Sequence, residues 1–100
     1  LIDNNIAAKI AQTKIHRVAI SIDGPNAEIH DKIRNQTGSF ESAIKGINFL
    51  KKHNINVQIN STISRKNIQH LENILKLAES LNACAWHIFM FVPVGCGINL

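Results

Sequence analysis

A short apolar stretch that carries two polar residues limits what this chain can fold into. Residues 18–23 read Val-Ala-Ile-Ser-Ile-Asp and are followed by a Gly-Pro pair. The β-branched residues predict a buried parallel strand, which Gly-Pro ends. Because side chains alternate along a strand, Ser21 and Asp23 share one face, opposite an apolar face. Burial of a carboxylate without partners is costly, so we expect this polar face to line a cavity that holds a polar ligand.

The rest of the chain alternates helix-like and strand-like segments. Apolar residues at helical spacing predict a helix over residues 1–13, already under way at its first residue for lack of a capping residue. Further predicted elements are a helical turn over 27–34, a helix over 39–53 with Ser39 as N-cap, a strand over 57–63, a helix that Asn67 caps and Asn82 ends, and a strand over 86–92. Such alternation indicates βαβ units whose strands are parallel and end at one edge of the sheet.

Each predicted strand has one apolar face and one polar face. The residues on the polar faces are Ser21, Asp23, Gln58, Asn60, Thr62 and His87. An open doubly wound sheet needs apolar residues on both faces, whereas a barrel that holds a ligand can be polar inside. We therefore predict an α/β fold with about three consecutive βα units of a parallel barrel. Because three strands cannot close a barrel, residues 1–100 are expected to be a piece of a longer chain.

Composition and charge exclude several classes of protein. A chain of 100 residues suffices for one small domain, and its formal net charge is +4. The basic residues are scattered, and adjacent pairs such as Arg65 and Lys66 are typical of a solvated surface rather than a nucleic-acid interface. No segment resembles a membrane span or a signal peptide. The two cysteines, Cys84 and Cys96, are widely spaced and fit a reduced, cytoplasmic protein.

Several motifs, in this order, resemble the middle of radical S-adenosylmethionine (SAM) enzymes. They are Ser-Ile-Asp-Gly-Pro at 21–25, Ile-His-Asp-Lys-Ile-Arg at 29–34 and Gly-Ser-Phe-Glu at 38–41. The resemblance is strongest to the branch of peptide-modifying maturases, sulfatase maturases and alternative-haem biosynthesis proteins. Residues 59–64 and 86–95 look like the family's fifth and sixth strands, and the ending is most similar to the alternative-haem group.

The resemblance implies a partial (β/α)6 barrel, of which residues 1–100 are the C-terminal half with strands four to six. In such enzymes SAM lies across the strand ends on a [4Fe–4S] cluster. Electron transfer from a donor then cleaves SAM to a 5′-deoxyadenosyl radical, which modifies a peptide or a tetrapyrrole. The cofactors carry that chemistry, and the protein positions them.

The resemblance also implies roles for particular residues. Ser21 matches the serine that bonds the SAM ribose, and Asp23 is a ribose or structural partner. Arg34 matches the arginine that pairs with the methionyl carboxylate, for which its planar fork is suited. The other residues implied for the cofactor site are Asn60 and Thr62, under SAM or the substrate, and Phe91, Val92 and Pro93, against the adenine.

One family feature is absent from the chain. Nothing matches the C-x3-C-x2-C loop that binds the cluster, and two distant cysteines cannot replace it. We therefore expect the cluster ligands upstream, an isolated chain that is inactive, and open sheet edges through which it self-associates. Cys96 stands where relatives commonly have a basic residue.

Other interpretations of the same residues remain open. As purely structural residues, Ser21 and Asp23 would cap the following turn, and Arg34 would lie on the surface. Separately, a degenerate barrel would keep the fold and bind a peptide or metabolite at its mouth without radical chemistry. A second alternative is an independent small α/β binding domain. Outside the site, Cys84 is expected to be a buried apolar residue, and His30 and Asp31 to belong to a helix start.

Overall fold

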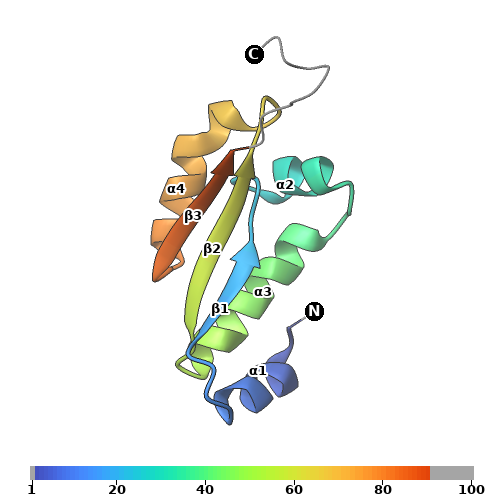
Figure 1. Cartoon of the computed structure of the whole chain (residues 1–100). Coiled ribbons are helices and arrows are strands. Elements are labelled where there is room, and N and C mark those ends of the chain that lie inside the picture. The colour runs from blue at the N-terminus through green and yellow to red at the C-terminus, as the bar shows by residue number, and fades with distance from the viewer. Residues whose placement is uncertain (1, 91–100) are drawn as a thin grey trace, which may run out of the picture.

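The computed structural model describes residues 2–90, which form a parallel sheet and its helices (Figure 1). The elements are α1 (Asn4–Ala11), β1 (Arg17–Ser21), α2 (Ala27–Arg34), α3 (Ser39–Lys52), β2 (Asn56–Ile63), the 3-10 helix η1 (Ile68–His70), α4 (Leu71–Ser80) and β3 (Ala85–Met90). The strands are parallel in the order β1-β2-β3. The predicted α/β fold of successive βα units is confirmed, and it matches part of a parallel α/β barrel.

The register of the sheet brings the polar residues of the three strands side by side. Ser21 of β1 pairs with Asn60 of β2, which pairs with His87 of β3. On this face the Gln58 side chain donates a hydrogen bond from Nε2 to Asn60 Oδ1 at 2.6 Å. Its Nε2 also lies 3.2 Å from His87 Nδ1. The predicted gathering of polar side chains on one face is therefore confirmed.

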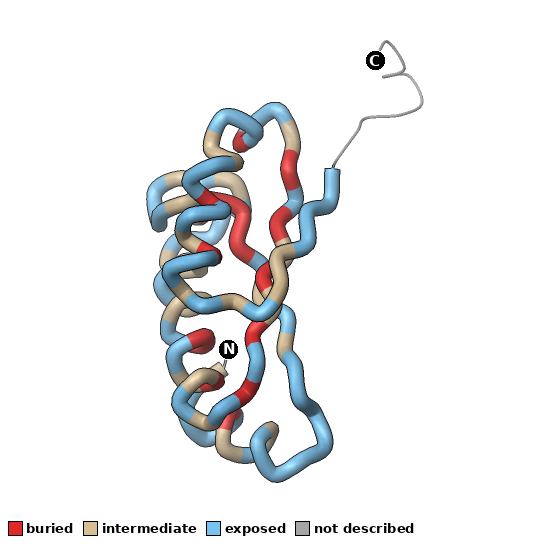
Figure 2. Tube along the Cα trace, turned by 90° about the vertical axis from the view of Figure 1, so that its left-hand side faces the viewer, coloured by how far each residue is buried: buried red, intermediate tan, exposed pale blue. Residues whose placement is uncertain are grey.

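The core lies on the other face, under the helices. Figure 2 shows the helices on one side of the strands and no helix on the opposite side. The main buried apolar side chains are Ala7, Ile22, Ile47, Leu50, Ile55, Val57, Ile59 and Ala78. Full burial of an isoleucine or leucine side chain stabilises a fold by roughly 1.5–3 kcal/mol. The core therefore fixes which face of the sheet is left open.

The predicted starts of two helices are wrong. Helix α1 begins at Asn4, and the carboxylate of Asp3 accepts a hydrogen bond from the Ile6 amide at 2.8 Å. Ser39 is not an N-cap, because the cap residue of α3 is Gly38, whose φ is 86°. A φ in this range favours glycine. By contrast, Asn82 lies just after α4 with a φ of 58°, as expected of a residue that ends a helix.

The predictions for the last strand need correction. The predicted apolar face of this strand includes Ile88 and Met90, which are 41% and 60% exposed rather than buried. Strand β3 is an edge strand of the described sheet, so no further strand covers it there. Cys84, expected to be buried, is exposed just before this strand. Phe91, Val92, Pro93 and Cys96 lie outside the described residues. Within residues 2–90, no helix combines the length and apolarity needed to cross a membrane.

Candidate functional site

The candidate site lies at the edge of the sheet where the parallel strands end. A cavity of about 600 Å³ opens there, and its walls include Asp23, Arg34 and Thr62. A second cavity of about 440 Å³ contains Ser21 and borders α3. Arg34 lines both cavities, so it separates the region of Ser21 from the region of Thr62. The structure thus brings four of the predicted site residues to one edge.

Asp23 joins three segments of the chain. Its side chain is almost completely buried, and its Oδ1 accepts a hydrogen bond from the Thr62 amide at 2.8 Å. Its Oδ2 lies 2.7 Å from Arg34 Nη1 in an ion pair. The preceding residue, Ile22, still donates its amide to Asn60 in the strand ladder. The carboxylate therefore continues the pairing of β1 with β2 where a backbone carbonyl would otherwise do so.

The backbone of Asp23 is also fixed, in this case by His30. The Asp23 amide donates to His30 Nδ1 at 2.9 Å, so this nitrogen is an acceptor and the ring is neutral. His30 is buried, and its ring meets that of Phe40 edge to face with centroids 5.6 Å apart. Burial lowers the pKa of His30 below its ordinary value, and nearby Arg34 lowers it further, while Asp23 and Asp31 oppose that change. His30 is a structural residue here.

The glycine after Asp23 lets α2 approach the strand end closely. A Cβ atom added to Gly24 would lie 2.5 Å from the backbone nitrogen of His30. No side chain fits at that distance without a movement of α2. Gly24 is therefore needed for the packing that places α2, and with it Arg34, beside Asp23.

Arg34 is the last residue of α2 and is oriented by its pair with Asp23. Its side chain is 39% exposed. Asn35, with a φ of 52°, ends the helix directly after it. A guanidinium has five N–H donors, and the Asp23 contact uses one nitrogen. The remaining donors are available at the cavity, as binding of a ligand carboxylate requires.

Ser21, Asn60 and Thr62 follow the pattern predicted for the open face. Ser21 and Thr62 are exposed, and Asn60 is half-buried. Ser21 and Asn60 are direct partners across β1 and β2. The set therefore offers a hydroxyl, an amide and a guanidinium around one edge, which suits a ligand with hydroxyl and carboxylate groups such as SAM.

Sequence reasoning missed two buried polar residues that support the site. Asn67 donates from Nδ2 to the carbonyls of Asp23 and Thr62, both at 2.9 Å, and accepts from the Ser64 amide at 2.8 Å. As predicted, Asn67 directly precedes the next helical segment, at the N-cap position of η1, but its side chain makes no cap hydrogen bond there and closes the loop after β2 instead. The Ser61 hydroxyl donates to the Ile22 carbonyl and accepts from Trp86 Nε1. Its position on the apolar face of a strand was the available signal.

Comparison with known proteins decides the family of the chain. Residues 1–78 match the model of the Radical SAM superfamily. The chain belongs to the radical SAM superfamily. This radical SAM chain is 46% identical over 100 residues to an AdoMet-dependent heme synthase of Oleidesulfovibrio alaskensis and 42% identical over 100 residues to one of Nitratidesulfovibrio vulgaris. Both alignments cover 100% of this chain.

The similarity extends to a protein named as a maturase. A mycofactocin maturase, MftC, of Mycolicibacterium smegmatis is 32% identical over 96 residues, which are 95% of this radical SAM chain. The chain spans about a quarter of the length of these relatives: 26% and 27% of the two heme synthases and 24% of the maturase. The resemblance deduced from the motifs at residues 21–41 is confirmed.

The superfamily implies SAM and a [4Fe–4S] cluster, and these two groups differ in how well they fit the chain. The donors at the strand ends fit SAM, as described above. A [4Fe–4S] cluster is held by a set of cysteine thiolates. The 100 residues contain two cysteines, of which Cys84 lies just before β3. Two cysteines cannot supply that set by themselves.

Proposed function

We propose that the parent protein is a radical SAM enzyme of haem biosynthesis, and that residues 1–100 supply the C-terminal half of its barrel. In this proposal the chain forms the ribose- and carboxylate-binding side of the SAM site. One observation carries it: Arg34 is held by a buried Asp23 at the strand ends and lines the same cavity as Ser21. A guanidinium fixed in this way is suited to a bidentate pair with a carboxylate.

Each residue of the site has a separate task. The Ser21 hydroxyl bonds the SAM ribose, and the free edge of Arg34 binds the methionyl carboxylate. Asn60 and Thr62 form the surface beneath SAM or the substrate. Phe91, Val92 and Pro93 stay a prediction for the adenine side. When bound, SAM would supply the radical chemistry, and the [4Fe–4S] cluster that this chemistry needs would be held by cysteines outside residues 1–100.

The substrate class is proposed from the relatives. Three AdoMet-dependent heme synthases are 39–46% identical to the chain, and the peptide maturase MftC of Mycolicibacterium smegmatis is 32% identical. We therefore assign a tetrapyrrole substrate, with a peptide as the second candidate. The reaction also needs an electron donor, and an iron–sulfur protein of this kind fits a cytoplasmic location.

Binding of SAM to the anaerobically reconstituted full-length protein tests the proposal. We expect Arg34→Gln to weaken SAM binding about tenfold or more in calorimetry, because a charge-assisted hydrogen bond contributes about 1.5–3 kcal/mol. Ser21→Ala removes one neutral hydrogen bond and should have a smaller effect. The matched control is Lys52→Gln, at the far end of α3. An unchanged affinity in Arg34→Gln contradicts the assignment.

A further inference from the structure

The function proposed above assigns no ligand to two cationic side chains at the strand ends. Arg65 and Lys66 lie in the loop between β2 and η1 and line the same cavity as Asp23 and Arg34. In the described part of the chain, the ion pair of Asp23 with Arg34 is the only one that these four residues form. Three cations and one carboxylate leave two positive charges at the cavity. The cavity therefore favours a negatively charged ligand.

Hydrogen bonds to the ends of the strands fix the loop that carries these cations. Buried Asn67 bonds the Ser64 amide on one side and the carbonyls of Asp23 and Thr62 on the other. The Lys66 amide also donates to the Ser64 hydroxyl at 3.2 Å. The backbone from which Arg65 and Lys66 project is thus attached to the strand end at Asp23. Such pre-organisation lowers the entropy lost when a ligand binds.

An apolar surface lies next to this charged cavity. Phe89 of β3 is the register partner of Thr62, which lines the cavity, and Phe89 is 53% exposed. Ile33 of α2 forms part of the cavity wall. An apolar surface beside a positive cavity suits a ligand that combines an apolar body with acidic groups.

We propose that Arg65 and Lys66 bind carboxylate groups of a tetrapyrrole, in addition to the SAM carboxylate assigned to Arg34. The inference rests on the proposed function and specifies how its substrate is recognised. A tetrapyrrole such as haem is an apolar macrocycle with propionate carboxylates at its edge. The guanidinium of Arg65 matches a carboxylate in a bidentate pair, and the ammonium of Lys66 adds a mobile point charge.

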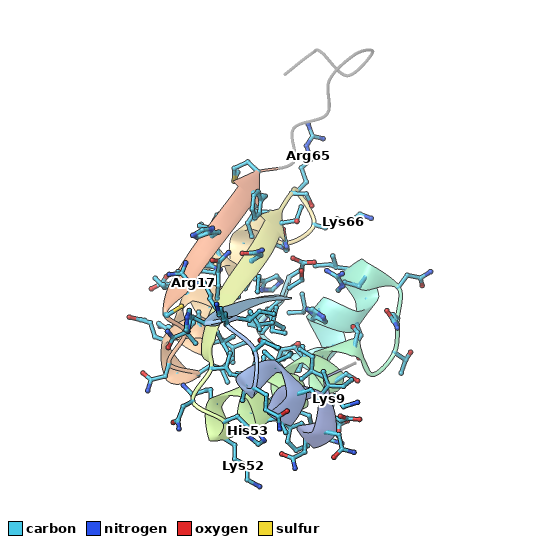
Figure 3. The ribbon with its side chains drawn as sticks, turned by 60° about the horizontal axis from the view of Figure 1, so that its bottom comes forward. Lys9, Arg17, Lys52, His53, Arg65 and Lys66 are labelled. Atoms are coloured by element: carbon cyan, nitrogen blue, oxygen red, sulfur yellow. The ribbon has the colours of Figure 1, made fainter. Side chains whose placement is uncertain are left out.

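The chain offers a matched control for these two residues. Figure 3 shows Arg65 and Lys66 near the end of β2, whereas Lys9 and Lys52 lie at the opposite end of the molecule. All four side chains belong to exposed residues. Replacement of either pair by glutamine therefore removes the same charge from the surface, but only one pair faces the cavity.

The test measures whether the full-length, reconstituted protein distinguishes a tetrapyrrole acid from its ester. The probes are iron protoporphyrin IX and its dimethyl ester, titrated anaerobically by their visible absorption. Because both share the iron and the macrocycle, a difference in affinity reports the carboxylates. We expect the unmodified protein and the Lys9→Gln/Lys52→Gln control to bind the acid about tenfold more tightly. The Arg65→Gln/Lys66→Gln variant should lose that preference.

Each result has a defined meaning. A protein with no preference for the acid, or a preference that survives in Arg65→Gln/Lys66→Gln, overturns the inference. Calorimetry with SAM separates this from the proposed function, because the double variant should bind SAM as tightly as the unmodified protein. If the unmodified protein does not bind SAM but still prefers the acid to the ester, the SAM site is refuted and the carboxylate site is supported. The single variants Arg65→Gln and Lys66→Gln provide the same comparison if the double variant does not fold.

Discussion

Asp23 is the residue on which the site depends most, because it connects the sheet to Arg34. From the cost of burying its carboxylate we predicted a cavity with a polar ligand, whereas in the structure the buried carboxylate is bonded by the Thr62 amide and Arg34. Its partners were not predictable, because Thr62 is 39 positions away in the sequence and the bond is to a backbone amide. The same limitation applies to His30, whose role depends on the path of the chain after β1. Side-chain type predicts that a partner exists, whereas the fold determines which one it is.

Substitution of Asp23 separates its structural role from its positioning role. Asp23→Asn retains an oxygen for the Thr62 amide but removes the charge that holds Arg34. We expect it to lower SAM affinity severalfold in the full-length protein with a small loss of stability. Asp23→Ala also leaves a buried amide without a partner, which costs about 1–3 kcal/mol in the free energy of unfolding. Equal SAM affinity in Asp23→Asn and the unmodified protein would exclude the positioning role.

The buried His30 predicts how stability depends on pH. Its pKa is lower in the folded protein than the ordinary value of 6.5, mainly because of burial. The unfolded chain therefore binds a proton more readily, so stability is highest above pH 6.5 and decreases as the pH falls through the lowered pKa. Denaturant unfolding of the protein between pH 7.5 and about 5 measures this slope. His30→Gln should reduce the slope, and an unchanged slope would show that another group is responsible.

At the scale of the elements, the order and type of helices and strands were predictable from the sequence. The period of the apolar residues sets these features, and it is a local property. The helix ends were less predictable, and the start of α3 is fixed by a side chain of another helix. Asp31, inside α2, accepts hydrogen bonds from the amides of Gly38 and Phe40 and from the Ser39 hydroxyl. The start of α3 is thus capped by the preceding helix.

Removal of this cap should loosen the junction between α2 and α3. The pKa of Asp31 is lowered below its ordinary value of 3.8, mainly by the hydrogen bond from the Phe40 amide, while burial opposes the shift. The Gly38 amide and the Ser39 hydroxyl lower this pKa further. The ionised Asp31 therefore stabilises the folded protein above pH 3.8, and this stabilisation is lost as the pH falls through the lowered pKa. Asp31→Ala should lower the thermal midpoint at pH 7, and hydrogen exchange should increase at residues 38–42. Glu41→Ala, on the exposed side of the same helix turn, is the control. Equal exchange in both variants would contradict the capping role.

At the scale of the whole molecule, we propose that the described residues form one side of a binding site. The open face of the sheet carries polar groups in register, and the strand ends carry the donors and cations that a charged cofactor and substrate require. Nothing in residues 1–100 matches the cysteine loop of the family, so the proposed chemistry depends on the rest of the parent protein. The account therefore makes its clearest prediction for the full-length protein.

The most direct test is the iron content and visible absorption of the anaerobically reconstituted full-length protein, with and without SAM. We expect about four irons per chain, the count that a [4Fe–4S] cluster requires, and a spectrum that changes when SAM is added. The spectral change should need a higher SAM concentration in Arg34→Gln than in Lys52→Gln. A colourless protein without iron would contradict the radical mechanism and leave a barrel-derived binding protein.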